Sequence, residues 1–248
     1  MSGSNRPIAM TALALVFLVP SACTWSFGTP EPETTEMHQR FSRTVDIQTG
    51  VVLGDLGRAQ RAAAWLATHE ETEALTRDSE THPARIRGYA SQISRASDLD
   101  SVAQQAGQMA GACGDCHTAM GKGPRFVVGS GAPQGNSRAA AMIRHLWAAD
   151  RMWEGLVGPS EDAWEAGARA LIGYRIAGAK LLAAASSLDA AEGHLARIRS
   201  LGQEAERVTT QEGRARVYTE LLSTCRGCHE SGKVLVEGQE PGGVFSGF

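Results

Sequence analysis

The sequence predicts an all-α protein made of two tandem four-helix-bundle-like halves joined by a Gly/Pro-rich linker. Alanine is abundant whereas β-branched and aromatic residues are sparse, a composition that favours helix over strand. Proline is nearly absent from residues 36–120 and 137–231, but Gly, Pro and Ser crowd the stretch 121–136 between them. Each block also closes with the same five-residue pattern. These features indicate an internal duplication.

The N-terminal segment differs from the rest of the chain. Residues 1–23 contain one Arg and then an apolar run that is short for a bilayer span, which predicts a secretory signal peptide; an uncleaved N-terminal anchor is the alternative. Cys23 follows Pro-Ser-Ala, which resembles the processing site of bacterial lipoproteins, so Cys23 is a candidate lipidation site. Residues 24–35 are rich in Pro, Glu and Thr and are expected to form a flexible tether. We therefore expect an exported, periplasmic protein, anchored to the membrane if Cys23 is lipidated.

The first half, residues 36–120, divides into four expected helices. Breaks fall at Gly54, at the His82-Pro83 step and at Ser97-Asp98. The expected ranges are 36–53, 55–69, 84–97 and 99–117.

The second half, residues 137–231, shows the same order of features and precedes a loose tail at 232–248. Helix-start signals occur at Ser160, at Asp189 with Glu192, and at Thr209 with Glu212. Helices with short connections suggest an antiparallel bundle in each half. The expected ranges are 137–157, 161–185, 188–208 and 211–229.

Four of the five cysteines lie in two CxxCH motifs, CGDCH at 113–117 and CRGCH at 225–229. Helical periodicity places both cysteines and the following His of each motif on the face that bears the apolar residues. This pattern is typical of c-type haem attachment, with two thioethers to the porphyrin and the His as proximal iron ligand. The motifs predict two covalently bound haem c groups. The cofactor-binding residues are Cys113, Cys116, Cys225 and Cys228, and the proximal ligands are His117 and His229.

Three other interpretations of CxxC fit less well. A zinc ribbon needs two CxxC pairs close together, and a thioredoxin-like pair needs a βαβ setting. A disulfide framework gives no reason for a His after the second Cys in both motifs.

The position of the motifs selects among haem-protein architectures. In small class I cytochromes c the motif lies near the start of the domain with a Met ligand downstream, but no Met follows His229. Both motifs instead end the last expected helix of their half, and this layout resembles the four-helix-bundle cytochrome c prime group. The stretch RHLWAADRMWEGLVGPS at 144–160 is also similar to a segment of tandem dihaem cytochromes. The resemblance implies a four-helix bundle in each half, with the distal ligand on the first helix or absent.

The first expected helix of each half carries candidate distal ligands. His38 and His145 are the first candidates because each shares a helical stripe with apolar residues, and Met37 and Met142 are the second. Aligning the halves at Gly54 and Gly158 pairs His38 with Met142, so the two sites are not expected to be identical.

These residues predict an electron carrier rather than an enzyme. Its partners would be redox proteins, including a membrane-bound electron-transfer complex, and the membrane itself only through the N-terminal lipid or signal anchor. If the distal positions are open, the alternative is a five-coordinate haem protein that binds or senses NO or CO. A dihaem peroxidase is disfavoured because known ones resemble paired class I domains. The dispersed charges, with a net charge of −3, do not indicate nucleic-acid binding.

Overall fold

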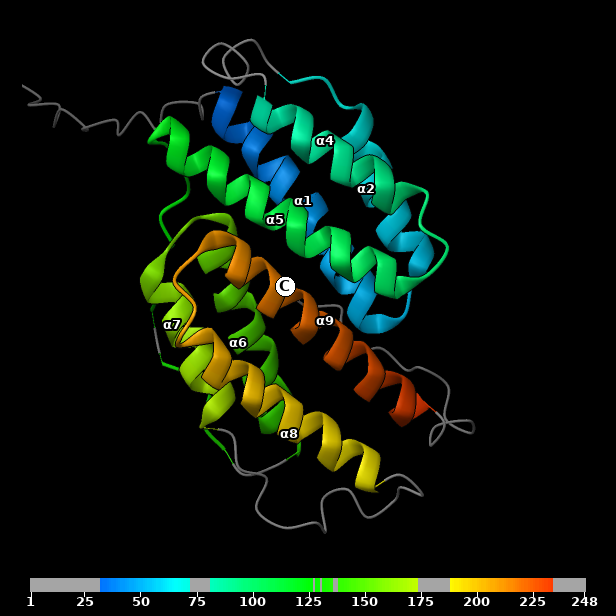
Figure 1. The fold of residues 1–248 in the computed structure, drawn as a ribbon, viewed down its shortest axis with the longest axis vertical. Coiled ribbons are helices and arrows are strands. Elements are labelled where there is room, and N and C mark those ends of the chain that lie inside the picture. The colour runs from blue at the N-terminus through cyan, green and yellow to red at the C-terminus, as the bar shows by residue number, and fades with distance from the viewer. Residues whose placement is uncertain are drawn as a thin grey trace, which may run out of the picture. The chain divides into compact units, whose positions relative to one another are not determined.

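The computed structural model describes residues 32–71, 81–126, 128–129, 131–135, 138–173 and 188–233. Within these ranges the chain forms eight helices and no strand, which confirms the all-α prediction. Residues 1–31, with the expected signal peptide and Cys23, lie outside these ranges. Residues 174–187, which include the end of the expected helix 161–185, and the tail beyond 233 also lie outside them. The helices are α1 (Pro32–Leu53), α2 (Leu56–Thr68), α4 (Thr81–Ser94), α5 (Leu99–Met120), α6 (Arg138–Val157), α7 (Glu161–Ile172), α8 (Leu188–Ala205) and α9 (Gln211–Lys233) (Figure 1).

Two helix starts differ from the sequence-based expectation by more than one residue, and one capping residue also differs. Helix α1 begins at Pro32, inside the expected tether. Helix α4 begins at Thr81 and takes Pro83 into its first turn, where a proline is tolerated because the backbone N–H groups of that turn have no intrahelical acceptor. The hydroxyl that caps α9 belongs to Thr210, which accepts a hydrogen bond from Gly213 N at 3.1 Å, rather than to Thr209.

Each run of four consecutive helices closes on itself. In the first half α1 packs on α2, α2 on α4, α4 on α5, and α5 returns to α1. In the second half α6, α7, α8 and α9 repeat the same sequence of neighbours, and α9 returns to α6. The chain from Pro32 onward nevertheless forms one compact unit, because helices of the two halves also pack on each other.

The contact between the halves is centred on α5 and α9, which lie side by side in the middle of the molecule (Figure 1). The two helices are antiparallel, since Asp100 at the start of α5 pairs with Arg226 near the end of α9. They approach so closely at Gly107 that a Cβ there would lie 2.1 Å from Thr219 Oγ1 and 2.8 Å from Ala215 O. Only glycine permits this approach.

Two further contacts join the halves. Helix α1 packs on α9, and α5 packs on α6, so each motif-bearing helix touches the first helix of the other half. The segment between α5 and α6 also lies against both halves: the Phe126 ring is 5.9 Å from that of Phe41, and Phe126 contacts the Gly158 backbone.

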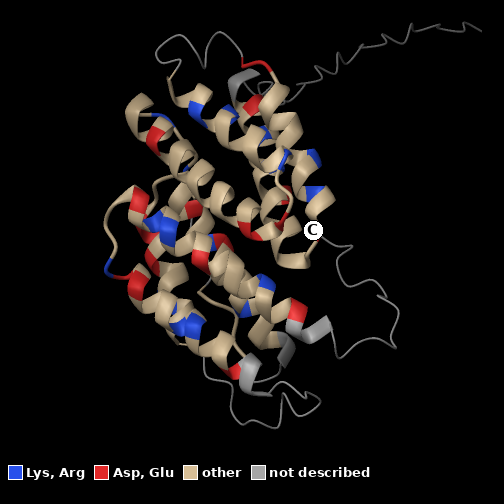
Figure 2. Cartoon of the chain, turned by 45° about the vertical axis from the view of Figure 1, so that its right-hand side comes forward, with Lys and Arg blue, Asp and Glu red and all other residues tan. Residues whose placement is uncertain are grey.

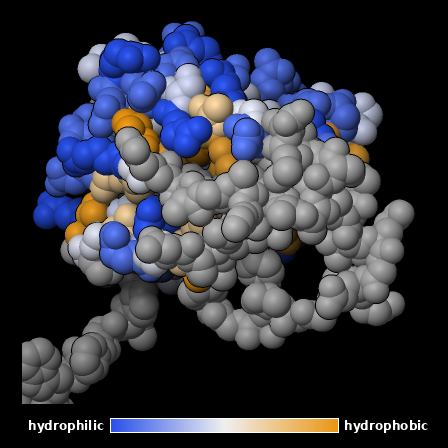
Figure 3. Space-filling model, turned by 90° about the horizontal axis from the view of Figure 1, so that it is seen from below, coloured by the Kyte–Doolittle hydropathy of each residue, from blue (hydrophilic) through white to orange (hydrophobic). Residues whose placement is uncertain are grey.

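In the view of Figure 2, Lys and Arg are interspersed with Asp and Glu along the described helices, and no stripe of one sign is visible. Viewed from below, hydrophobic residues are interspersed with hydrophilic ones on the part of the surface that is not grey (Figure 3). None of the described helices combines the length and the apolar character that a bilayer crossing requires.

Candidate functional site

The CGDCH motif forms the last turns of α5. The helix ends at Gly121, whose left-handed conformation (φ 60°) lets its N–H reach back to the His117 and Thr118 carbonyls. His117 Nδ1 lies 2.7 Å from Val157 O at the end of α6. A carbonyl only accepts hydrogen bonds, so Nδ1 carries the proton and Nε2 keeps its lone pair. Histidine ligands of metals are commonly oriented by this type of hydrogen bond.

None of the four motif cysteines forms a disulfide among the described residues, and all four are partly buried. Burial raises the pKa of Cys113 to about 12 and that of Cys225 to about 12, and it also raises the pKa of Cys116. In the absence of a bound metal these environments disfavour the thiolate, the form in which a dithiol redox pair reacts. A thioether is neutral, so burial does not oppose it.

Arg40 of α1 lies beside the first motif. The pKa of Cys113 is raised by burial and by Cys116, but the charge of Arg40 lowers it in part. Arg40 is itself buried, and its Nε donates to Glu36 Oε1 at 2.9 Å. Its Nη2 faces Glu71 Oε1 at 3.6 Å and makes no hydrogen bond to any described residue. The first half therefore holds a buried guanidinium near Cys113, paired with Glu36 and Glu71.

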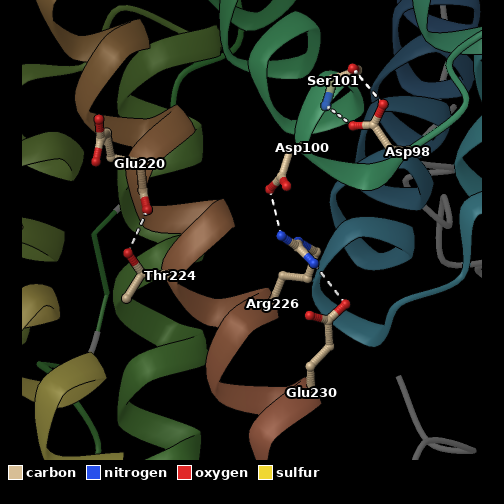
Figure 4. Close-up of polar contacts among 7 residues, drawn as sticks. All are labelled: Asp98, Asp100, Ser101, Glu220, Thr224, Arg226 and Glu230. Atoms are coloured by element: carbon tan, nitrogen blue, oxygen red, sulfur yellow. Dashed lines mark hydrogen bonds and ion pairs between the residues drawn. The ribbon is translucent and has the colours of Figure 1, made fainter. Parts of the chain in front are cut away.

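The CRGCH motif lies near the end of α9. Arg226, inside the motif, binds Asp100 of α5 at 2.6 Å and Glu230 at 2.7 Å (Figure 4). Asp98 caps α5 just before this contact by accepting the Ser101 N–H at 2.8 Å. The second motif is thus tied to the first turn of the helix that carries the first motif. His229 is exposed at this end of α9.

His194 of α8 also approaches the second motif. Its ring lies against Gly227, where an added Cβ would be 2.8 Å from His194 Cε1. The small residue between Cys225 and Cys228 therefore admits an imidazole from the neighbouring helix.

Helix α6 faces α9 at the level of the second motif. The Tyr218 hydroxyl donates to Ala149 O at 3.3 Å, and the rings of Tyr218 and Trp153 are 5.2 Å apart. Met142 precedes Ala149 by two helical turns, and Cys225 follows Tyr218 by two turns. Because α6 and α9 run in opposite directions, seven residues back along α6 and seven residues forward along α9 reach the same height in the bundle, and each step of two turns returns to the same face of its helix. This count puts Met142 at the level of Cys225, and the Met142 side chain is exposed (38%).

His145 lies one turn further along α6 than Met142, toward Tyr218, and is half-buried. Burial, with a smaller contribution from Arg144, lowers its pKa to about 4. The imidazole is consequently neutral at pH 7, the form that can donate a lone pair to a metal.

The candidates on α1 are placed differently from each other. Met37 is half-buried and lies one turn before Arg40, whereas His38 is exposed. Two residues of helix separate His38 from Arg40, a rotation of about 200°. Arg40 is therefore the α1 residue whose charge acts on Cys113, and His38 lies on the other, exposed side of the helix.

The turns after α1 and α6 give the correspondence between the halves. Gly50 O accepts from Asp55 N at 2.8 Å, and Gly155 O accepts from Ser160 N at 3.2 Å. The Asp55 and Ser160 side chains then cap α2 and α7. This equivalence differs by one residue from the Gly54–Gly158 alignment, because these capping residues rather than the glycines match. It pairs Met37 with Met142 and Arg40 with His145.

The sequence alone did not single out Val157, Arg40 or His194 as neighbours of the motifs. The Val157 contribution is a backbone carbonyl, which no side-chain pattern encodes. One feature of the sequence could have indicated a buried Arg40: Glu36 lies one helical turn earlier, where it can pair with the arginine.

No protein-family model, no curated protein and no solved structure matches this chain. Within the described ranges, no three His, Cys, Asp or Glu side chains are grouped so that they could hold a metal ion by themselves.

The residues present fit a covalently attached haem. Burial favours the neutral thiol form of Cys113 and Cys225, the His117 ring is oriented by Val157 O, and Arg40 places a buried guanidinium, the kind of group that binds carboxylates, near Cys113. Haem propionates are carboxylates of this kind.

Proposed function

We propose that this protein is an exported dihaem c-type cytochrome that transfers electrons. The observation that carries the proposal is the hydrogen bond between His117 Nδ1 and Val157 O, which orients the imidazole of a CxxCH motif as a ligand. Haem, when bound, supplies an iron that cycles between ferric and ferrous states. The chain's own part is to attach this group through two cysteines, to hold the proximal imidazole and to exclude water.

Each four-helix set would be one copy of a duplicated haem-binding unit. In this proposal Cys113, Cys116 and His117 serve the first copy, and Cys225, Cys228 and His229 serve the second. The matching helix neighbours and the matching caps at Asp55 and Ser160 support it. The protein is not an enzyme in this proposal, and its partners are redox proteins.

The proposed place of action is the periplasm, with attachment to a membrane if Cys23 is lipidated. This proposal rests on the residue pattern before α1 alone. A periplasmic location agrees with covalent attachment of haem, because covalent attachment prevents loss of the haem outside the cytoplasm.

The attachment test compares two double variants with the full chain in a host that matures c-type cytochromes. We expect two haems in the wild type, measured by intact mass and by the pyridine haemochrome spectrum. Cys113→Ala/Cys116→Ala and Cys225→Ala/Cys228→Ala should each retain one haem. A wild-type chain that folds but acquires no covalent haem under these conditions would exclude the proposal.

Optical and EPR spectra of the same preparations test the choice of function. Low-spin, six-coordinate iron is expected for an electron carrier, since both axial positions are filled. High-spin, five-coordinate iron at both centres would instead favour binding of NO or CO.

A further inference from the structure

The first and second halves differ at one position next to the attachment cysteines. The matching turns after α1 and α6 make Arg40 the counterpart of His145. The core supports this pairing, because Ile47 and Val51 on α1 correspond to Met152 and Leu156 on α6, and all four side chains are fully buried. Equivalent backbone positions therefore present a guanidinium in one half and an imidazole in the other.

Both side chains face the motif-bearing helix of their own half. The Arg40 charge reaches Cys113, and α1 packs on α5. His145 precedes Ala149 by about one turn on the side of α6 that receives the Tyr218 hydroxyl. It therefore lies level with the turn of α9 that leads into Cys225.

The two groups have different chemistry toward a metal centre. A neutral imidazole is a ligand, whereas a guanidinium stays protonated and has no lone pair to donate. Arg40 is also fixed where it is: Glu36 binds its Nε, and Glu71, itself paired with Arg87, lies beside its Nη2. A cation held at this place stabilises added negative charge nearby.

We propose that the two haem centres are inequivalent, with His145 as the distal ligand in the second half and Arg40 as a charged positioning residue in the first. This inference rests on the proposed function. The Arg40 charge raises the reduction potential of the centre beside it relative to a centre without such a cation. The first-half centre is therefore reduced first.

Potentiometric titration of the full dihaem protein, followed by optical and EPR spectra, tests the proposal. The wild type should show two one-electron midpoints whose reduction equilibrium constants differ at least tenfold, which corresponds to about 59 mV. The variants with a single remaining motif assign each midpoint to its half.

Substitutions then test each residue separately. His145→Gln should abolish the bis-imidazole EPR signature and leave the first-half midpoint unchanged. Arg40→Gln should lower the first-half midpoint, and Arg40→Lys, which keeps the charge, should restore it. Arg43→Gln is the matched control, since it removes the same charge from a more exposed position on α1 and should shift neither midpoint.

The outcomes separate this inference from the proposed function. Two covalent haems with coincident midpoints and identical EPR spectra would overturn the inference and leave the electron-transfer function standing. A His145→Gln protein with unchanged spectra would do the same. Absence of covalent haem would overturn the function itself. If Arg40→Gln does not fold, the His145→Gln spectra and the wild-type midpoints decide the matter.

Discussion

Buried tryptophans show how much a single hydrogen bond contributes at the residue scale. Trp164 and Trp153 are both about 1% exposed. Trp164 Nε1 donates to Ala205 O at 2.9 Å, and the Arg214 guanidinium lies 5.2 Å from the centre of its ring. Trp153 Nε1 has no acceptor among the described residues. The two rings are thus buried alike but bonded differently.

Trp164→Phe should therefore destabilise the protein more than Trp153→Phe. Both changes remove similar packing area, but only the first removes a buried hydrogen bond; Ala205 O keeps a longer bond from Val208 N at 3.4 Å, so the cost is about 0.5–1.5 kcal/mol. Urea unfolding of the two variants gives the difference in the free energy of unfolding. Equal losses in the two variants would contradict this interpretation of the Trp164–Ala205 contact.

At the scale of helices, the α5–α9 contact depends on small residues. Gly107→Val would push against Thr219 Oγ1 and the Ala215 carbonyl, and the carbonyl belongs to the helix backbone and cannot turn away. We expect a loss of about 1–3 kcal/mol in the free energy of unfolding from overpacking. Thermal or urea denaturation measures it.

Gly88 of α4 provides the matched control. A Cβ at Gly88 meets nothing within 4 Å, so Gly88→Ala should stabilise the protein by up to about 1 kcal/mol through helix propensity alone. A Gly107→Val protein as stable as the wild type would show that α5 and α9 can separate without cost.

The sequence predicted the helical class and most helix positions because caps and helix breakers act locally. Gly54, Ser160 and the Ser97-Asp98 step lie where the structure has the corresponding turns. The motif residues were also identifiable, since their spacing is short. The contacts of α5 with α6 and of α1 with α9 were not, because they join residues distant in the chain. The same reason explains why the His117 partner and the exposed position of His38 were missed.

At the scale of the whole molecule, Asp150 connects the two halves. It lies on α6, accepts a hydrogen bond from Gln48 of α1, and its charge raises the pKa of the buried Tyr218 of α9. Burial raises the pKa of Asp150 above its usual 3.8, although Arg151 and Gln48 act in the opposite direction. At a pH between the unfolded and the folded pKa of Asp150, the folded protein therefore binds a proton that the unfolded chain has released.

This proton linkage predicts a pH dependence of stability. Below its unfolded pKa the Asp150 carboxyl is protonated in both states, and as the pH rises through the folded pKa the folded state loses free energy relative to the unfolded state. Asp150→Asn should remove this loss, so that its stability falls less than that of the wild type as the pH rises above about 4, the unfolded pKa of an Asp. Denaturation at a series of pH values measures the slope.

Glu192→Gln, an exposed carboxylate on α8, is the control and should preserve the wild-type slope. If Asp150→Asn also preserves that slope, Asp150 does not bind an extra proton in the folded protein.

The hydrogen bond from His117 to Val157 has a consequence for the order in which the protein matures. His117 precedes its carbonyl partner along the chain, and α6 must form before that carbonyl is in place. A chain made from its N-terminus thus completes the CGDCH motif well before it can orient the histidine. The His117 ring is oriented only after the first helix of the second half has formed, so the CGDCH turn of the first half depends on chain that follows it.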